Sequence, residues 1–124
     1  MLLGEARAGE IETWFASASG VVCSELTLVE CRRTLEIRAA AGLAVAGARA
    51  RLELIAPLWD VADMSGVVLR SAEKRWPVEP ARTLDAVHLA TMVELRAAGE
   101  ELTILTLDRR VRENALALGF PVLP

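Results

Sequence analysis

Short runs of apolar residues alternate along this chain with longer segments that have helical periodicity. The clearest runs, residues 21–23 and 102–107, are too short for helices, and the second alternates Leu and Ile with Thr as strands often do. Short apolar strands separated by helices of about ten or more residues are typical of α/β domains with a parallel sheet. We therefore expect an α/β fold in which helices flank a parallel sheet.

Local signals place the ends of the expected helices. Residues 5–18 have an amphipathic pattern that Gly20 ends. Ser24 is a good N-cap for a helix that reaches about residue 40, and a second helix runs to about residue 56, before Pro57. The remaining expected elements are a weak strand at 58–61, a helix at 65–75, a proline-rich loop at 76–80, a helix at 84–98 capped by Thr83, a helix from Asp108 to Gly119 and a strand at 121–123.

The length of the chain fits a single domain, residues 1–124, which we expect to be cytoplasmic. A hydrophobic content of 53% and a net charge of −3 exclude the collagen-like, low-complexity and disordered classes. No run approaches the roughly 18 apolar residues of a membrane span, and the opening apolar residues are too few for a signal peptide. We expect the two cysteines to be free thiols in a reducing compartment.

Three acidic residues occupy positions that solvated acids usually avoid. Glu30 lies in mid-helix on the same face as Leu26 and Ile37, and Asp85 shares its face with Leu89. Asp108 directly follows an expected strand, at the edge of a parallel sheet where ligands bind.

Each of these acids also has an ordinary explanation. Asp108 can cap the next helix, Asp85 can interact with the helix dipole, and Glu30 can extend to water from the edge of its apolar face. If the three meet, however, each pair at 4 Å repels by about 4 kcal/mol at an effective dielectric constant of 20. A hard cation such as Mg²⁺ or Mn²⁺ resolves that repulsion and can activate water for attack on a phosphate.

Four segments carry a resemblance to a known family. They are SELTLVE at residues 24–30, TLDAVHLAT at 83–91, TLDRR at 106–110 and GFPVL at 119–123. In this order they resemble the PIN-domain ribonucleases, and in particular the VapC toxins of bacterial type II toxin–antitoxin systems. The resemblance covers about residues 3–124, and the segment at 83–91 is its most specific part.

The resemblance implies a five-stranded parallel sheet flanked by helices and a Mg²⁺- or Mn²⁺-dependent endoribonuclease that cleaves RNA by metal-activated water. Glu30, Asp85 and Asp108 match three members of the family's metal-binding quartet of acids, and Thr106 matches a supporting polar residue. The family also implies a homodimer and a small antitoxin that neutralises it.

One part of the family pattern has no match. The family opens with a central strand that carries its first catalytic aspartate, and the start of this chain resembles the segment after that strand. Either the true start codon lies upstream or the gene has decayed, and we favour the first because the other acids and the core pattern are intact. In both cases we expect this chain to be a poor nuclease, and the alternative function is an inactive module that binds only antitoxin or a sister subunit.

Other residues have competing interpretations. We interpret His88 as a packed structural residue, and Cys23 and Cys31 as core residues, not zinc ligands. Arg110 is the first choice for a contact to RNA phosphate, and the alternative is that it lies on a solvated helix face.

A third, weaker hypothesis for the whole chain is an unrelated α/β phosphate-binding protein. It is weaker because no Gly-rich loop follows a strand. The three tryptophans, expected to be core or interface anchors, are Trp14, Trp59 and Trp76.

Overall fold

The structure is a computed structural model of the chain, and it describes residues 13, 14 and 16–123. The chain forms two compact units, which we call unit 1 (Met1–Asp63) and unit 2 (Met64–Pro124). Each unit has its own helices, its own pair of parallel strands and its own apolar core. The expectation that residues 1–124 act as one domain stays a prediction.

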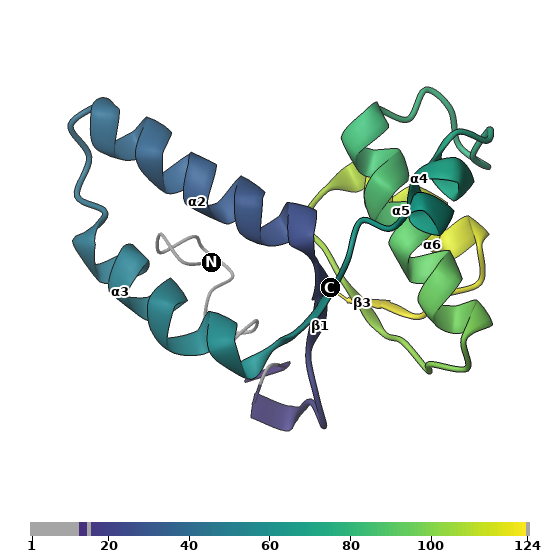
Figure 1. Cartoon of the computed structure of the whole chain (residues 1–124), viewed down its shortest axis with the longest axis horizontal. Helices are drawn as coiled ribbons and strands as arrows, with labels where there is room; N and C mark the ends of the chain where they lie inside the picture. The colour runs from purple at the N-terminus through teal and green to yellow at the C-terminus, as the bar shows by residue number, and fades with distance from the viewer. Residues whose placement is uncertain (1–12, 15, 124) are drawn as a thin grey trace. The chain divides into compact units, whose positions relative to one another are not determined.

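Unit 1 is built around two helices, α2 (Glu25–Ala40) and α3 (Ala46–Ile55), which lie side by side (Figure 1). Helix α2 begins where expected, because Ser24 Oγ accepts a hydrogen bond from the Leu26 N–H at 3.1 Å. The chain turns after α2 at Gly42, whose φ of 80° is readily adopted only by glycine. The buried core between the helices consists of Leu35, Val45, Ala48, Leu52 and Ala56.

The strands of unit 1 are short. β1 (Val22–Ser24) pairs in parallel with β2 (Asp60–Ala62), and the Asp60 N–H donates to the Val21 carbonyl at 2.9 Å. The 3₁₀ turn η1 (Ala56–Leu58) joins α3 to β2. Because Pro57 lies inside this turn, the strand expected at 58–61 begins two residues later, at Asp60.

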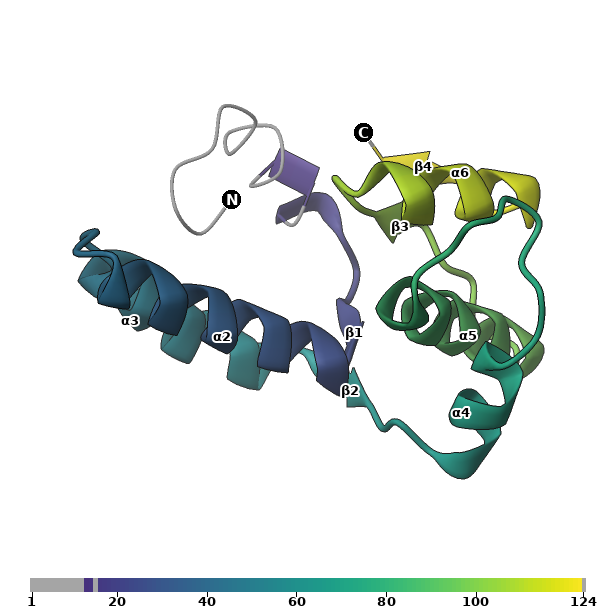
Figure 2. The same cartoon turned by 90° about the horizontal axis from the view of Figure 1, so that it is seen from above.

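Unit 2 is centred on helix α5 (Thr83–Ala97), against which α4 (Gly66–Ala72) and α6 (Arg109–Ala117) pack (Figure 2). Leu89 and Ala90 of α5 are fully buried. Helix α4 ends three residues before the expected end at 75, because the chain turns there to bury Trp76. The indole Nε1–H of Trp76 donates to the Ala72 carbonyl at 3.3 Å and satisfies one free carbonyl at the helix end.

The strands of unit 2, β3 (Ile104–Leu105) and β4 (Val122–Leu123), also pair in parallel. The Ile104 N–H donates to the Pro121 carbonyl at 2.9 Å, and the Thr106 N–H donates to the Leu123 carbonyl at 3.1 Å. Helix α6 connects the two strands, and its residue Ala115 packs in a buried core with Ile104 and Phe120. This arrangement places Asp108 directly between the end of β3 and the start of α6.

The predicted α/β class with parallel strands is confirmed. The strand expected at 102–107 is shorter, since only Ile104 and Leu105 have ladder partners in β4. Of the helix expected at 5–18, residues 13, 14, 16 and 17 are described and helical, and the rest lies outside the described residues or, at residue 18, is not helical. The predicted absence of the family's first strand stays a prediction. None of the helices within residues 13, 14 and 16–123 has the length and apolar character that crossing a bilayer requires.

Candidate metal centre

Asp85 lies in the first turn of α5 and is almost completely buried, with 4% of its surface exposed. Its Oδ2 accepts a hydrogen bond from the backbone N–H of Arg82 at 3.1 Å. Arg82 is therefore the N-cap residue, and the expectation that Thr83 caps this helix is wrong. The reason is that a carboxylate at the third helical position can reach back to the N-cap N–H, which leaves Thr83 as the first helical residue.

Asp108 caps helix α6, as expected. Its Oδ1 accepts hydrogen bonds from the backbone N–H groups of Arg110 at 2.8 Å and Val111 at 3.0 Å. Thr106 lies beside it, because Thr106 Oγ1 accepts a hydrogen bond from the Asp108 N–H at 3.1 Å. These bonds fix the position of the carboxylate at the end of β3 while its side chain stays 39% exposed. The role of Thr106 in supporting a metal ligand stays a prediction.

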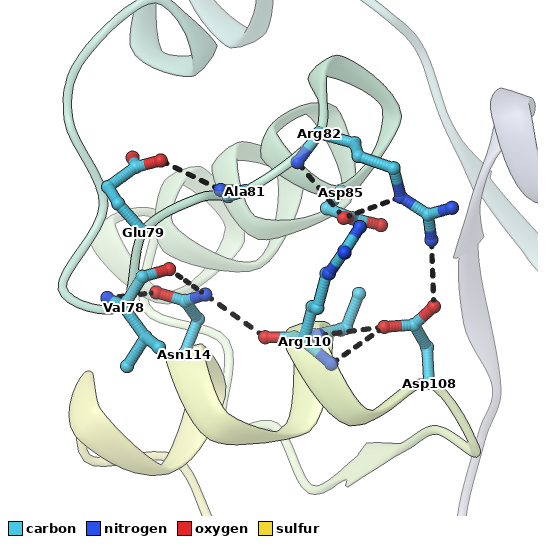
Figure 3. Close-up of polar contacts among 9 residues, drawn as sticks. Val78, Glu79, Ala81, Arg82, Asp85, Asp108, Arg110 and Asn114 are labelled. Atoms are coloured by element: carbon cyan, nitrogen blue, oxygen red, sulfur yellow. Dashed lines mark hydrogen bonds and ion pairs between the residues drawn. The ribbon is translucent and has the colours of Figure 1, made fainter.

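The side chain of Arg82 joins these two acids, which we call the carboxylate pair (Figure 3). Its Nε lies 3.3 Å from Asp85 Oδ2, and its Nη2 lies 3.3 Å from Asp108 Oδ2. Two acids that are 23 residues apart in the chain are thus brought to one guanidinium, inside unit 2. The cation offsets the repulsion that two neighbouring carboxylates would otherwise have.

The loop before Arg82 is fixed by the hydrogen bonds of two polar side chains, Asn114 and Glu79. Asn114 of α6 is fully buried, and its amide forms hydrogen bonds with both the N–H and the carbonyl of Val78. The Glu79 carboxylate accepts hydrogen bonds from the backbone N–H groups of Trp76 at 2.8 Å and Ala81 at 2.7 Å. These bonds hold the pKa of Glu79 below its ordinary value. The loop residues that lead to Arg82 are therefore held by hydrogen bonds (Figure 3).

A hollow lies between this loop and the start of α6. It is lined by Val78, Glu79, Pro80, Arg109, Arg110 and Glu113. Arg109 is paired with Glu113 at 2.8 Å, and this hydrogen bond raises the pKa of Arg109. Arg110 is exposed and follows Asp108 of the carboxylate pair by two residues in the sequence. Its role in holding RNA phosphate stays a prediction.

Glu30 lies in unit 1, in the middle of α2, and is half-buried. Leu26 on the same face is buried, whereas Ile37 is 54% exposed, so the apolar face expected around Glu30 is buried only in part. Because Glu30 belongs to unit 1 and the carboxylate pair belongs to unit 2, the meeting of the three acids stays a prediction.

The carboxylate pair has the donor chemistry of a site for Mg²⁺ or Mn²⁺. Both residues offer carboxylate oxygens, and both already contact one positive group. Within the described part of unit 2, no third His, Cys, Asp or Glu side chain completes a group that could hold a metal ion. Two carboxylates are nevertheless enough for Mg²⁺, which usually keeps several waters. The residues of unit 2 therefore fit such an ion as a pair of ligands.

Six other residues singled out in the sequence have ordinary structural surroundings. His88 is half-buried on α5, which agrees with a packed residue. Cys23 and Cys31 are free thiols, and Cys31 packs against the core of unit 1. Burial raises the pKa of both thiols, so both favour the neutral form. Trp76 is buried at 4% exposure, whereas Trp14 and Trp59 are half-buried.

Sequence reasoning missed two residues of this site, Arg82 and Asn114. A signal for Arg82 is its spacing of three residues before Asp85, which places the two within reach at a helix start. Asn114 had a weaker signal, a polar residue between Val111 and Ala115 on the apolar face of α6. Its partner Val78 is 36 residues away, and no local pattern indicates that contact.

A comparison with known protein families shows to which family the chain belongs. The family model described as "PIN domain" matches residues 1–116, which is most of the chain and includes both members of the carboxylate pair. The chain belongs to the PIN-domain family. The family resemblance seen in the sequence is thereby confirmed.

Two curated proteins are similar to this PIN-domain chain. "Ribonuclease VapC35" of Mycobacterium tuberculosis (strain CDC 1551 / Oshkosh) is 32% identical over 103 residues, which cover 82% of this chain and 70% of that protein. The protein of the same name from strain ATCC 25618 / H37Rv has the same identity and coverage. A comparison with solved structures finds no significant match. Within the PIN-domain family, this chain is therefore similar to proteins of the VapC type.

Proposed function

We propose that this PIN-domain chain is a metal-dependent endoribonuclease, the toxin of a toxin–antitoxin pair. The observation that carries the proposal is the carboxylate pair, Asp85 and Asp108, held around one cationic group. Membership of the PIN-domain family and the similarity to a protein named ribonuclease support the same assignment.

In this proposal Asp85, Asp108 and Glu30 are the ligands of Mg²⁺ or Mn²⁺. Such an ion supplies the charge that activates a water and neutralises charge developing on a phosphate. Asp108 is held in place by the helix N–H groups and by Thr106, so its partly exposed carboxylate is already positioned for a ligand. The exposed guanidinium of Arg110 would bind a phosphate of the RNA backbone.

The proposed partners are RNA, a cognate antitoxin and a second copy of this chain. Large apolar side chains of unit 1 are exposed and can supply a protein interface, and the most exposed are Val29 at 56%, Leu54 at 74% and Leu58 at 80%. The two free thiols agree with a reducing cytoplasm as the place of action.

An RNA cleavage assay tests the proposed activity. Cleavage by the chain, however slow, should need Mg²⁺ or Mn²⁺, stop with EDTA, and fall by at least about 100-fold in Asp85→Asn and in Asp108→Asn. Glu100→Gln is the matched control, because Glu100 is an exposed acid of unit 2 outside the site. Cleavage that persists in EDTA, or that both Asn variants retain at the parent's rate, would contradict the proposal.

The exposed apolar residues of unit 1 favour a second candidate function, a non-catalytic module that binds antitoxin or a sister subunit. The two candidate functions differ in whether the chain cleaves RNA in a metal-dependent way. A chain that forms a stable dimer or antitoxin complex but has no metal-dependent cleavage under any of these conditions supports the second function.

A further inference from the structure

The guanidinium of Arg82 contacts Oδ2 of Asp108, the oxygen that does not cap helix α6. Asp108 Oδ1 accepts the two backbone N–H groups at the start of α6, whereas Oδ2 is 3.3 Å from Arg82 Nη2. On Asp85 the same side chain contacts Oδ2 through Nε at 3.3 Å. Arg82 therefore contacts one oxygen of each member of the carboxylate pair (Figure 3).

The chemistry of arginine suits this bridging position. Its guanidinium is always charged and directs several N–H donors along a fixed planar fork, so it can bind two separate acceptors at once. The Asp85 side chain is only 6% exposed, and an uncompensated charge there would be costly. Arg82 supplies the positive charge that keeps both acids together in the absence of another cation.

A divalent cation bound to the same two oxygens would be repelled by Arg82. The Arg82 side chain is 64% exposed, so it can turn towards water without disturbing a core. The backbone of Arg82 would stay in place, since its N–H donates to Asp85 and its carbonyl accepts from the Ala86 N–H at 2.9 Å. Displacement of this side chain therefore needs no unfolding of α5.

We infer that Arg82 is a positioning residue that holds the carboxylate pair together without metal and competes with the divalent cation for it. This inference rests on the proposed function, because it assumes that the pair binds the ion. The affinity of the site for metal is then set partly by the free energy of breaking two ion pairs. Because ion pairs with partly exposed groups are weak, the competition lowers metal affinity without preventing binding.

Mn²⁺ titration of the full chain by isothermal calorimetry tests the inference, with Arg82→Gln compared to the parent. We expect Arg82→Gln to bind Mn²⁺ on the order of tenfold more tightly, since two ion pairs no longer have to be broken. Arg109→Gln is the matched control, because it removes the same charge from unit 2 but breaks a pair with Glu113 instead. The control should bind Mn²⁺ within about twofold of the parent.

A second measurement separates competition from general damage to the site. In EDTA, Arg82→Gln should melt at a lower temperature than the parent, and saturating Mn²⁺ should raise its melting temperature by more than it raises the parent's. If Arg82→Gln does not fold, Arg82→Lys takes its place, because lysine keeps the charge but cannot bridge both acids with a fork. It should then bind Mn²⁺ more tightly than the parent.

The possible results are distinct. Equal or weaker Mn²⁺ binding by a folded Arg82 variant, with the parent still binding, overturns the competition and leaves the proposed metal site intact. Absence of Mn²⁺ binding in both the parent and the Arg82 variant overturns the metal site and the competition together.

Discussion

The buried amide of Asn114 is bonded to both polar groups of the Val78 backbone. Asn114 Oδ1 accepts from the Val78 N–H at 2.8 Å, and Asn114 Nδ2 donates to the Val78 carbonyl at 3.0 Å and to the Arg110 carbonyl at 3.0 Å. This side chain thereby connects the first turns of α6 to the loop that leads to Arg82. Asn114 therefore holds the loop against the helix, in addition to the contact between Arg82 and Asp108.

Asn114→Ala should destabilise the chain by about 2–3 kcal/mol, because it removes the hydrogen bonds to the Val78 backbone and opens a small cavity at a fully buried position. The free energy of unfolding in urea measures the loss. Leu116→Ala on the same helix is the control, and it should change that free energy by less, since Leu116 is 51% exposed. Equal effects of the two substitutions would contradict the structural role of Asn114.

Asp108 has two separable roles: it caps helix α6, and its negative charge pairs with Arg82. Asp108→Ala should destabilise the chain by about 1 kcal/mol, because the N–H groups of Arg110 and Val111 lose their acceptor. Asp108→Asn should keep most of that stability, since asparagine is also a good N-cap. Thermal melting in EDTA measures both. If alanine and asparagine destabilise equally, the capping role assigned to Asp108 is wrong.

Glu79 should make the stability of unit 2 depend on pH in the acid range. The N–H groups of Trp76 and Ala81 stabilise the charged carboxylate, so the pKa of Glu79 lies below its ordinary value of 4.5. A lowered pKa in the folded state stabilises the fold above the ordinary pKa, and this contribution is lost as the pH falls from 4.5 towards the lowered value.

The measurement is the melting temperature of the parent and of Glu79→Gln between about pH 7 and about pH 3. The parent should melt higher at neutral pH, and the difference should shrink below 4.5, the ordinary glutamate value. The exposed Glu100→Gln serves as control and should show no such change. A difference for Glu79→Gln that stays constant over this range would argue against the loop contacts.

The parts of the fold that depend on neighbouring residues could be predicted from the sequence. The caps Ser24 and Asp108 were predicted, because an N-cap is a contact over two or three residues and has its own residue types. The α/β class followed from the alternation of short apolar runs with helical segments. The strand expected at 102–107 is longer than the observed β3, since apolar composition does not show where ladder partners end.

The connections across the chain could not be predicted. Thr83 is the usual residue type for an N-cap, yet the reach of the Asp85 carboxylate to the Arg82 N–H decided the helix start. The contacts of Arg82 with Asp108 and of Asn114 with Val78 span 26 and 36 residues. Such pairs form only when the helices pack, and the sequence alone does not show which residues the packing brings together.

The central claim is that Asp85 and Asp108 bind the divalent cation. Its most direct test is Mn²⁺ titration of the parent, Asp85→Asn and Asp108→Asn, with Glu100→Gln as the control. We predict that each Asn variant binds Mn²⁺ at least about tenfold more weakly than the parent, because it loses a charged oxygen ligand, and that the control is unchanged. Binding of Mn²⁺ by both Asn variants as tightly as by the parent would contradict the account.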